Sequence, residues 1–330
     1  MENKLIKKSI ESEYNIEVKS IEKFKSTYRI NGNEGYCLKI IKYDYPHFLF
    51  IIEAMNHLVE NGLRSVLPLL KTKSDKKYIR LGNKNAYLTK WINGEESNFD
   101  VLNQLDRIGE AVGELHVKSR NFSIPQFSKP RIGWMSWIKV FETRKNEIYD
   151  FKNRIHQKAY KNDFDKLYLE NFDSEIKRCD RAIEALKKSN YLNVMEKQVM
   201  KMGFCHHDLA NHNIILDKEN NINFIDFDYC ILDSNLHDLA SLLWRVNKFS
   251  TPSIEKTNKI LKGYTKKVSV DKDEIEIMKA FLSFPQEFWQ IGLQVYWEQQ
   301  PWGEEFMINK LENYLKIIEG KVNMIESIKI

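Results

Sequence analysis

A nine-residue stretch, CHHDLANHN at 205–213, concentrates three histidines, one aspartate and two asparagines. One interpretation is a zinc site, in which the three histidines bind the metal and Asp208 or Cys205 is the fourth ligand. Adjacent histidines in an extended segment point in opposite directions, however. The stretch also lacks the H-x₃-H spacing that would place two ligands on one helical face. A polar loop without chemistry is a second interpretation.

The third interpretation, a phosphoryl-transfer site, is favoured because the spacing continues beyond this stretch. Asp208 precedes Asn213 by five residues, and Asp226 follows Asn213 by thirteen, within FIDFD. Such a site needs a carboxylate that accepts the proton of a substrate hydroxyl, here Asp208. It also needs oxygen ligands for Mg²⁺, which Asn213 and Asp226 supply. His206 is then a structural residue whose ring braces the loop.

The first part of the chain offers a lysine and an acid for the same chemistry. YCLKI places Lys39 in a predicted strand, and Glu53 is a single acid within the apolar helix predicted for 45–62. A strand lysine that binds the α- and β-phosphates of a nucleotide and pairs with a helix glutamate is the arrangement of kinases. Glu60 is an alternative partner. Lys39 facing solvent and Glu53 as a surface acid are the simpler interpretations.

The predicted phosphate-binding turn, KFKSTYR at 23–29, contains no glycine. Kinases carry G-x-G-x-x-G between their first two strands. The backbone amides of Ser26 and Thr27 can still bind phosphate there, although the turn is stiffer.

The elements that must position these residues fall into two parts, which predict an α+β fold of two lobes. Residues 1–92 form a nucleotide-binding lobe with an antiparallel sheet, and residues 93–330 form a helical lobe with the catalytic loop and acceptor site. In the first lobe a helix is expected at 1–14 and at 45–62, where Pro46 suits the first turn and Gly62 the end. Strands are expected between 16 and 42 and at 64–72, 76–81 and 86–92. Asn-Gly and Gly within NGNEG, at 31–35, are expected to supply positive φ to a hairpin turn.

The second part is predicted to be helical apart from one strand-like island at 213–228. Helices are expected at 100–119, 134–159, 165–190, 254–267, 272–283, 285–299 and 303–327, with another beginning near Asp233 or Asn235. The boundary between the two parts is placed at 93–96, NGEE.

Composition excludes several classes of protein. Fifty-one Lys and Arg residues against 46 Asp and Glu give a net charge of +5, which is too small and dispersed to indicate nucleic-acid binding. Four cysteines without a CxxC pair suit a reducing compartment. The N-terminus lacks an apolar signal region and no long apolar run is present, so neither secretion nor a membrane span is expected.

The acceptor is predicted to be a small molecule. A protein kinase needs a long activation segment after its metal-binding aspartate. Here Asp226 is followed within seven residues by DSNLHDLASLLW, which starts a new helix. The aromatic residues Trp244, Trp289 and Trp297 are candidates for an acceptor pocket that holds a cation, although core packing is the simpler interpretation at helical spacing.

The motifs HHDLANHNI, FIDFDYC and HDLASLLWRV resemble the aminoglycoside phosphotransferase and choline kinase superfamily, which is protein kinase-like. With FDKLYLENF and FPQEFWQI, the chain more narrowly resembles the CotS-type spore coat proteins of endospore-forming bacteria. The resemblance implies ATP and Mg²⁺ as cofactors, with Asp208 catalytic and Asn213 and Asp226 binding the metal. It implies that Lys39 binds the nucleotide phosphates. LTKWI, at 88–92, matches the strand that holds the adenine, and the further residues implied are Thr89 and Trp91 at the nucleotide and Asp238 as structural support.

Two functions follow as hypotheses. The first is an ATP- and Mg²⁺-dependent phosphotransferase that acts on a small-molecule hydroxyl, synthesised in the cytoplasm and deposited in the spore coat with other coat proteins. The second is a non-catalytic coat component that keeps a kinase fold, which the turn without glycine favours and the complete Asp208–Asn213–Asp226 set disfavours. The acceptor itself is not predicted.

Overall fold

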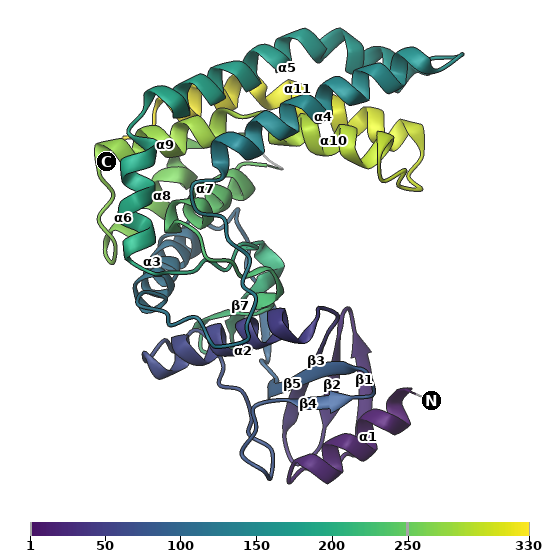
Figure 1. The fold of residues 1–330 in the computed structure, drawn as a ribbon, viewed down its shortest axis with the longest axis vertical. Helices are drawn as coiled ribbons and strands as arrows, with labels where there is room; N and C mark the ends of the chain where they lie inside the picture. Colours follow the sequence, from purple (N-terminus) through teal and green to yellow (C-terminus); the bar gives the residue numbers. More distant parts are fainter. Residues whose placement is uncertain (1, 249–250, 330) are drawn as a thin grey trace.

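The computed structural model describes residues 2–248 and 251–329. The chain forms an N-terminal lobe built on a sheet and a larger helical lobe (Figure 1). The N-terminal lobe comprises α1 (Glu2–Glu13), β1 (Ser20–Phe24), β2 (Thr27–Asn31), β3 (Gly35–Ile41), α2 (Tyr45–Glu60), β4 (Ile79–Leu81) and β5 (Lys84–Lys90). Its strands lie in the order β1-β2-β3-β5-β4, and all neighbouring pairs are antiparallel. The predicted fold class is confirmed.

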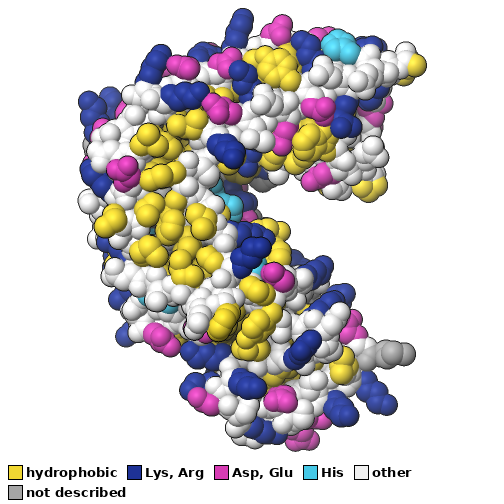
Figure 2. All heavy atoms as spheres, in the orientation of Figure 1, with side chains coloured by type: hydrophobic (Ala, Val, Ile, Leu, Met, Phe, Trp, Pro, Cys, Tyr) yellow, Lys and Arg dark blue, Asp and Glu magenta, His cyan; other side chains and the backbone are white. Residues whose placement is uncertain are grey.

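The second lobe begins with a strand and continues with helices. Its elements are β6 (Gly94–Glu96), α3 (Leu102–Lys118), α4 (Trp137–Gln157), α5 (Asp163–Lys188), α6 (Tyr191–Met200), the short 3₁₀ helix η1 (Asn211–Asn213), β7 (Ile214–Asp217), β8 (Ile222–Phe224), the 3₁₀ helix η2 (Phe227–Tyr229), α7 (Asn235–Val246), α8 (Ile254–Thr265), α9 (Lys272–Ser283), α10 (Gln286–Tyr296) and α11 (Glu304–Glu326). Helices α4, α5, α10 and α11 extend away from the rest of this lobe, so that the molecule has a deep concave side (Figures 1 and 2). Among the described helices, none combines the length and apolar character needed to cross a bilayer.

Three local predictions differ from the structure. Residues 64–72 contain no strand; Pro68 lacks an N–H, and Leu70 donates one hydrogen bond to Leu88 without forming a ladder. The turn at 31–35 joins β2 to β3 as predicted, but neither of its glycines has positive φ. Gly32 is instead required by space, since a Cβ there would lie 2.8 Å from the carbonyl oxygen of Glu17.

The third difference is β6, which lies in the segment that was predicted to divide the lobes. Its residues are exposed and mostly charged, so no alternation of polar and apolar residues marks it as a strand. It pairs with β7, and β7 pairs with β8, to give a three-stranded sheet beneath the catalytic loop. The link between the lobes is therefore part of the sheet that carries the motifs, and the division at residue 92 stays a prediction.

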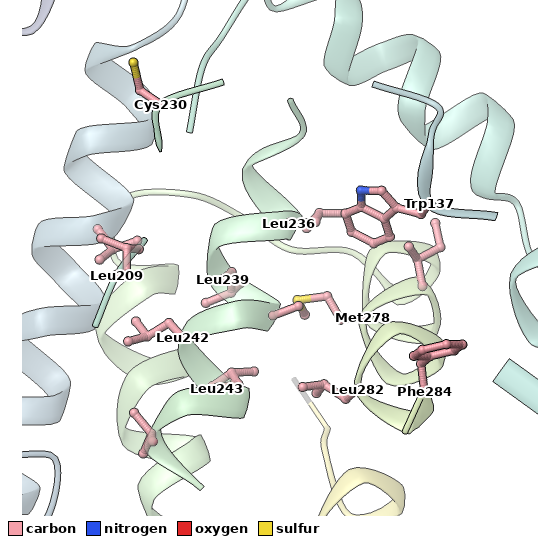
Figure 3. Close-up of a cluster of buried hydrophobic side chains, with 14 of the residues drawn as sticks. Trp137, Leu209, Cys230, Leu236, Leu239, Leu242, Leu243, Met278, Leu282 and Phe284 are labelled. Carbon is pink, nitrogen blue, oxygen red and sulfur yellow. The ribbon is translucent and has the colours of Figure 1, made fainter. Parts of the chain in front are cut away.

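Helix α7 positions the catalytic loop, because one of its faces is apolar and buried and fixes the helix in the core. Its N-cap is Ser234, whose hydroxyl accepts from the backbone N–H of Leu236, rather than the predicted Asp233 or Asn235. The buried side chains of α7 pack with residues of α9 and with Leu209 of the catalytic loop; those labelled in Figure 3 are Leu236, Leu239, Leu242, Leu243, Met278 and Leu282. Burying each such side chain contributes roughly 1.5–3 kcal/mol. This packing also holds Asp238 and Arg245 of α7 against the catalytic loop.

Candidate active site

The catalytic loop, residues 205–213, is anchored by one buried carboxylate. Asp238 of α7 accepts the backbone N–H groups of His206 at 2.7 Å and of His207 at 2.8 Å. His207 has a left-handed backbone with φ 69°. The other contact of Asp238 is the ring of His116 in α3, at 3.2 Å. Burial by itself would raise the pKa of Asp238, but the hydrogen bond and charge of His116 outweigh burial and hold this pKa well below its usual range.

His116 is itself held by a contact between two helices. Its second ring nitrogen lies 2.9 Å from the hydroxyl of Tyr264 in α8. Helices α3 and α8 approach closely at Gly263, where a Cβ would collide with the backbone carbonyl of Asp106. The loop is therefore connected through Asp238 and His116 to the packing of three helices.

The carboxyl group of Asp233, just before α7, leads to a prediction about how the stability of the fold depends on pH. Asp233 is buried and accepts from the backbone N–H of Ser234 at 2.7 Å, and burial raises its pKa to about 7. Because the folded protein holds this proton more tightly than the unfolded chain, the group contributes stability below about pH 4 that is lost as pH rises to 7. We expect Asp233→Asn to remove this loss. Between about pH 4 and pH 7, the free energy of unfolding of the variant should rise relative to that of the parent by up to about 1.4 kcal/mol per pH unit.

Equilibrium unfolding by urea between pH 4 and pH 8 measures the effect. Asp173→Asn is the matched control, since its side chain is 85% exposed. Parallel pH profiles for the parent and Asp233→Asn would contradict the assignment.

His206 connects the loop to the end of β8. Its Nδ1 lies 3.3 Å from the backbone N–H of Asp208 and accepts from it. The proton of this neutral ring is then on Nε2, which donates to the carbonyl oxygen of Ile225 at 2.9 Å. Since Ile225 immediately precedes Asp226, one buried imidazole sets the distance between the predicted base and the predicted metal ligand.

Both carboxylate oxygens of Asp208 are engaged. Oδ2 accepts from the side-chain amide of Asn213 at 2.8 Å, and Oδ1 lies 2.6 Å from Nη2 of Arg245. Asp208 is 24% exposed and Arg245 is 28% exposed, so both can be reached from solvent. Because the amide nitrogen of Asn213 also donates to the carbonyl oxygen of Asp208, its amide oxygen is the atom of this side chain that can bind a cation.

Lys39 joins the two lobes at the site. Its buried ammonium lies 2.8 Å from Asp226 Oδ2 and 3.4 Å from Asp228 Oδ2, and 3.5 Å from the hydroxyl of Ser26. Burial by itself would lower the pKa of Lys39, but the two carboxylates outweigh burial and raise it. Burial, together with the charge of Asp226, raises the pKa of Asp228 to about 6 against the opposing effect of Lys39.

The two aspartates fit a divalent cation. Asp226 has a left-handed backbone with φ 65°, which turns the chain at the end of β8. Oδ1 of Asp226 and Oδ1 of Asp228 are buried without a hydrogen-bond partner within residues 2–248 and 251–329. Buried acceptors without partners are costly, and carboxylate oxygens are the ligands that Mg²⁺ prefers. Asn213, Asp226 and Asp228 together supply the oxygen ligands of such a site.

The remaining predicted nucleotide residues lie on or beside the sheet that carries Lys39, with one exception. The β1–β2 turn consists of Lys25 and Ser26, and Lys25, at φ 52°, takes the left-handed conformation that glycine usually supplies. Lys25 pairs with Glu96 of β6 at 2.6 Å, which connects the turn to the second lobe. The exception is Glu53, which lies on α2; among the described residues Lys39 pairs with the two aspartates and not with Glu53.

Three further predicted residues lie on or beside the sheet. The hydroxyl of Thr27, the first residue of β2, donates to the carbonyl oxygen of Phe24. Thr89 is buried in β5, and Trp91 follows that strand, with its backbone N–H bonded to Gly35. Their backbones border the connection between the lobes.

The three predicted acceptor tryptophans do not form an empty aromatic cage. Lys248 lies over the ring of Trp244 at 4.4 Å, and Arg144 lies over the ring of Trp289 at 4.3 Å. Trp297 lies at the end of α10, where its indole N–H donates to Asp150 at 2.7 Å. One face of each of the first two rings therefore already carries a cation of the protein.

The geometry does not support the zinc interpretation. His206 is bonded within the loop, His207 stacks on His237 at 4.5 Å between ring centroids, and His212 is exposed. Within the described part of the chain, a different group has metal-ligand spacing: His116, Cys205 and Asp238. Burial raises the pKa of the Cys205 thiol well above its usual range, and its sulfur donates to the carbonyl oxygen of Ser234, so this group is a structural hydrogen-bond network.

Sequence reasoning missed two residues of the site. Asp228 was visible as the second acid of FIDFD, two residues after Asp226. Arg245 carried no such signal, because its distance from Asp208 depends on the angle between α7 and the loop.

This arrangement defines the class of the protein, a kinase-like fold of two lobes with a catalytic loop between them. Solved structures with a similar fold include the following three. An aminoglycoside phosphotransferase from Alicyclobacillus acidocaldarius matches with a TM-score of 0.85 at 18% identity, covering 97% of this chain and 94% of that one. A spectinomycin phosphotransferase in complex with ADP and spectinomycin matches with a TM-score of 0.72 at 15% identity, covering 99% and 98%. An amicoumacin kinase in complex with AMP-PNP and Ca²⁺ matches with a TM-score of 0.65 at 15% identity, covering 97% and 94%.

Within this class the chain belongs to one family, since residues 7–328 match the family model described as "Spore coat putative kinase YutH". The resemblance to spore coat proteins and to small-molecule kinases is confirmed. No curated protein matches the chain significantly.

Proposed function

We propose that this protein transfers the γ-phosphoryl group of ATP, with Mg²⁺, to a hydroxyl group of a small molecule. The observation that carries the proposal is the meeting of Lys39, from the N-terminal sheet, with Asp226 and Asp228 at the end of β8. A buried lysine beside two acids with unpartnered oxygens matches the chemistry of a nucleotide–metal site. The similar kinases crystallised with ADP, or with AMP-PNP and Ca²⁺, support a nucleotide and a divalent cation.

Each residue has a role in this proposal. Asp208 accepts the proton of the acceptor hydroxyl, and Lys39 binds the nucleotide phosphates. Asn213, Asp226 and Asp228 hold the cation, which when bound neutralises charge on the transferred phosphoryl group. Residues proposed at the nucleotide are Ser26, Thr27, Thr89 and Trp91; Glu53, which does not pair with Lys39, is left out of the proposal. His206 and Asp238 maintain the loop.

The acceptor is proposed to be small because little chain is available to dock a polypeptide. Only six residues separate Asp228 from the first residue of α7, Asn235. The family supports a place in the spore coat, and we propose that the protein is synthesised in the cytoplasm and deposited there beside other coat proteins.

Thermal unfolding with ATP, with and without Mg²⁺, tests the nucleotide site. Ligand at a hundred times its dissociation constant stabilises by about 2.7 kcal/mol, which raises the unfolding midpoint by several degrees. We expect a Mg²⁺-dependent shift in the parent and in the control Asp173→Ala, and no such shift in Asp226→Ala. A shift of equal size in Asp226→Ala would contradict the assignment.

The second candidate function, a coat component without catalysis, rests on the phosphate turn. That turn has two residues, no glycine, and an ion pair between Lys25 and Glu96 that restrains it. The absence of any shift at millimolar ATP in the parent would favour this candidate.

A further inference from the structure

We propose that the acceptor carries an oxyanion group, a phosphate or a carboxylate, and that Arg245 binds it beside Asp208. The inference rests on the proposed function and specifies its substrate class. The alternative is an acceptor that carries a cation, such as choline or an amine.

The first observation is an unused donor on Arg245. Nη2 of its guanidinium pairs with Asp208, but Nε is buried and has no hydrogen-bond partner within residues 2–248 and 251–329. An unsatisfied buried donor is costly, so the guanidinium gains a hydrogen bond by turning toward an oxyanion. Nε and Nη form a planar fork that matches a carboxylate or phosphate. An acceptor bound in this way would also release Oδ1 of Asp208 for its hydroxyl proton.

Two more nitrogens on the same face of α7 are also without a hydrogen-bond partner in the described part of the chain. Positions 237, 244 and 245 are separated by seven and eight residues, which places them on one side of a helix. Nδ1 of His237 and the indole N–H of Trp244 are buried without partners in the described chain. An indole nitrogen can only donate, so this face calls for a ligand that supplies acceptor oxygens.

Cationic side chains lie near these nitrogens. Burial, and after it the charges of His207, Arg144 and Arg245, lower the pKa of His237 to about 3 against the opposing charge of Asp238. Burial, with Arg245 among the cations that add to it, lowers the pKa of Lys248 to about 8 against the opposing charge of Glu287. Such charges disfavour a second cation beside Arg245 and favour an anion.

A fourth cation, Arg131, approaches from the loop before α4. Its guanidinium lies 4.9 Å from the ring centroid of Tyr43 and 5.5 Å from that of Tyr229. The charge of Arg131 contributes to lowering the pKa of His207, after burial, so it lies near the catalytic loop. Figure 2 shows Lys and Arg side chains on the wall of the concave side.

The contacts of the tryptophan rings also argue against a cationic acceptor. A cation-binding aromatic site leaves its ring faces to the ligand. Here Lys248 lies on Trp244 and Arg144 on Trp289, so a cationic acceptor would enter beside like charges.

Binding by a graded series of small hydroxyl compounds tests the inference. The protein is saturated with Mg-ADP, which fills the nucleotide phosphate sites, and thermal unfolding is followed at constant ionic strength with glycerol 3-phosphate, glycerate, glycerol or choline at millimolar concentration. We expect one or both anionic compounds to raise the midpoint by about 2–5 °C and glycerol and choline to have no effect. The phosphate and carboxylate arms then identify the oxyanion.

Arg245→Gln is expected to lose this shift and Arg245→Lys to retain part of it, because lysine keeps the charge without the fork. Arg64→Gln, an exposed arginine, is the control and is expected to behave as the parent. A shift with choline, no shift with either anion, or an anion shift that survives in Arg245→Gln would overturn the inference. The Mg-ADP shift itself, measured first in each variant, separates these results from failure of the nucleotide site.

Discussion

Asp208→Asn is expected to lower kcat by about 10²–10⁴-fold, the usual contribution of a positioned general base. The substitution preserves the size of the side chain but removes the negative charge that accepts the hydroxyl proton. It also places an amide donor near the amide of Asn213, which in the parent protein donates to Asp208 at 2.8 Å. The side chain of Asn213 can turn in response, so its affinity for the cation has to be followed separately.

The measurement is the rate of ADP formation with whichever small hydroxyl compound a screen shows to be an acceptor. The Mg²⁺-dependent thermal shift with ATP is recorded in parallel and is expected to persist at saturating Mg²⁺. His212→Asn is the matched control, because His212 is an exposed residue of the same loop. A loss of less than tenfold in Asp208→Asn would show that another group takes the proton.

Asp238→Ala is expected to lower the free energy of unfolding by about 3–5 kcal/mol, one of the larger losses that a single substitution causes. The carboxylate is fully buried and accepts three donors, the backbone N–H groups of His206 and His207 and the ring of His116. Each buried donor left without a partner costs about 1–3 kcal/mol. The strained backbone of His207 would also relax, and Asp208 would move with it.

Urea unfolding followed by tryptophan fluorescence and circular dichroism measures the loss. Asp238→Asn keeps the shape and one acceptor oxygen, so its loss is expected to be smaller. The exposed Asp173→Ala is expected to change the free energy of unfolding by less than about 0.5 kcal/mol. A loss below 1 kcal/mol in Asp238→Ala would mean that the catalytic loop is held by its remaining contacts, above all the ring of His206.

Most of the fold could be predicted because its elements follow local patterns. The helices at 45–62 and 100–119 are marked by apolar residues at helical spacing, and their positions agree with α2 and α3. The errors fall where pairing decides the outcome. Apolar residues at 64–72 make a single backbone hydrogen bond to β5, at Leu88, and do not continue it into a ladder, while the polar β6 becomes a strand because β7 lies beside it.

Within the site, the sequence by itself determined the contacts that lie within one loop. Asp208 and Asn213 are five residues apart, and a short hairpin carries the chain from Asn213 to Asp226, so their proximity follows from local geometry. The tertiary structure alone decided which charges meet. Lys39 pairs with Asp226, 187 residues away, rather than with Glu53, and Arg245 reaches Asp208 across 37 residues. Local hydrogen bonds set the geometry of neighbouring residues. The partner of a buried charge depends instead on how helices and sheets pack against one another, and the spacing of residues along the sequence does not determine that packing.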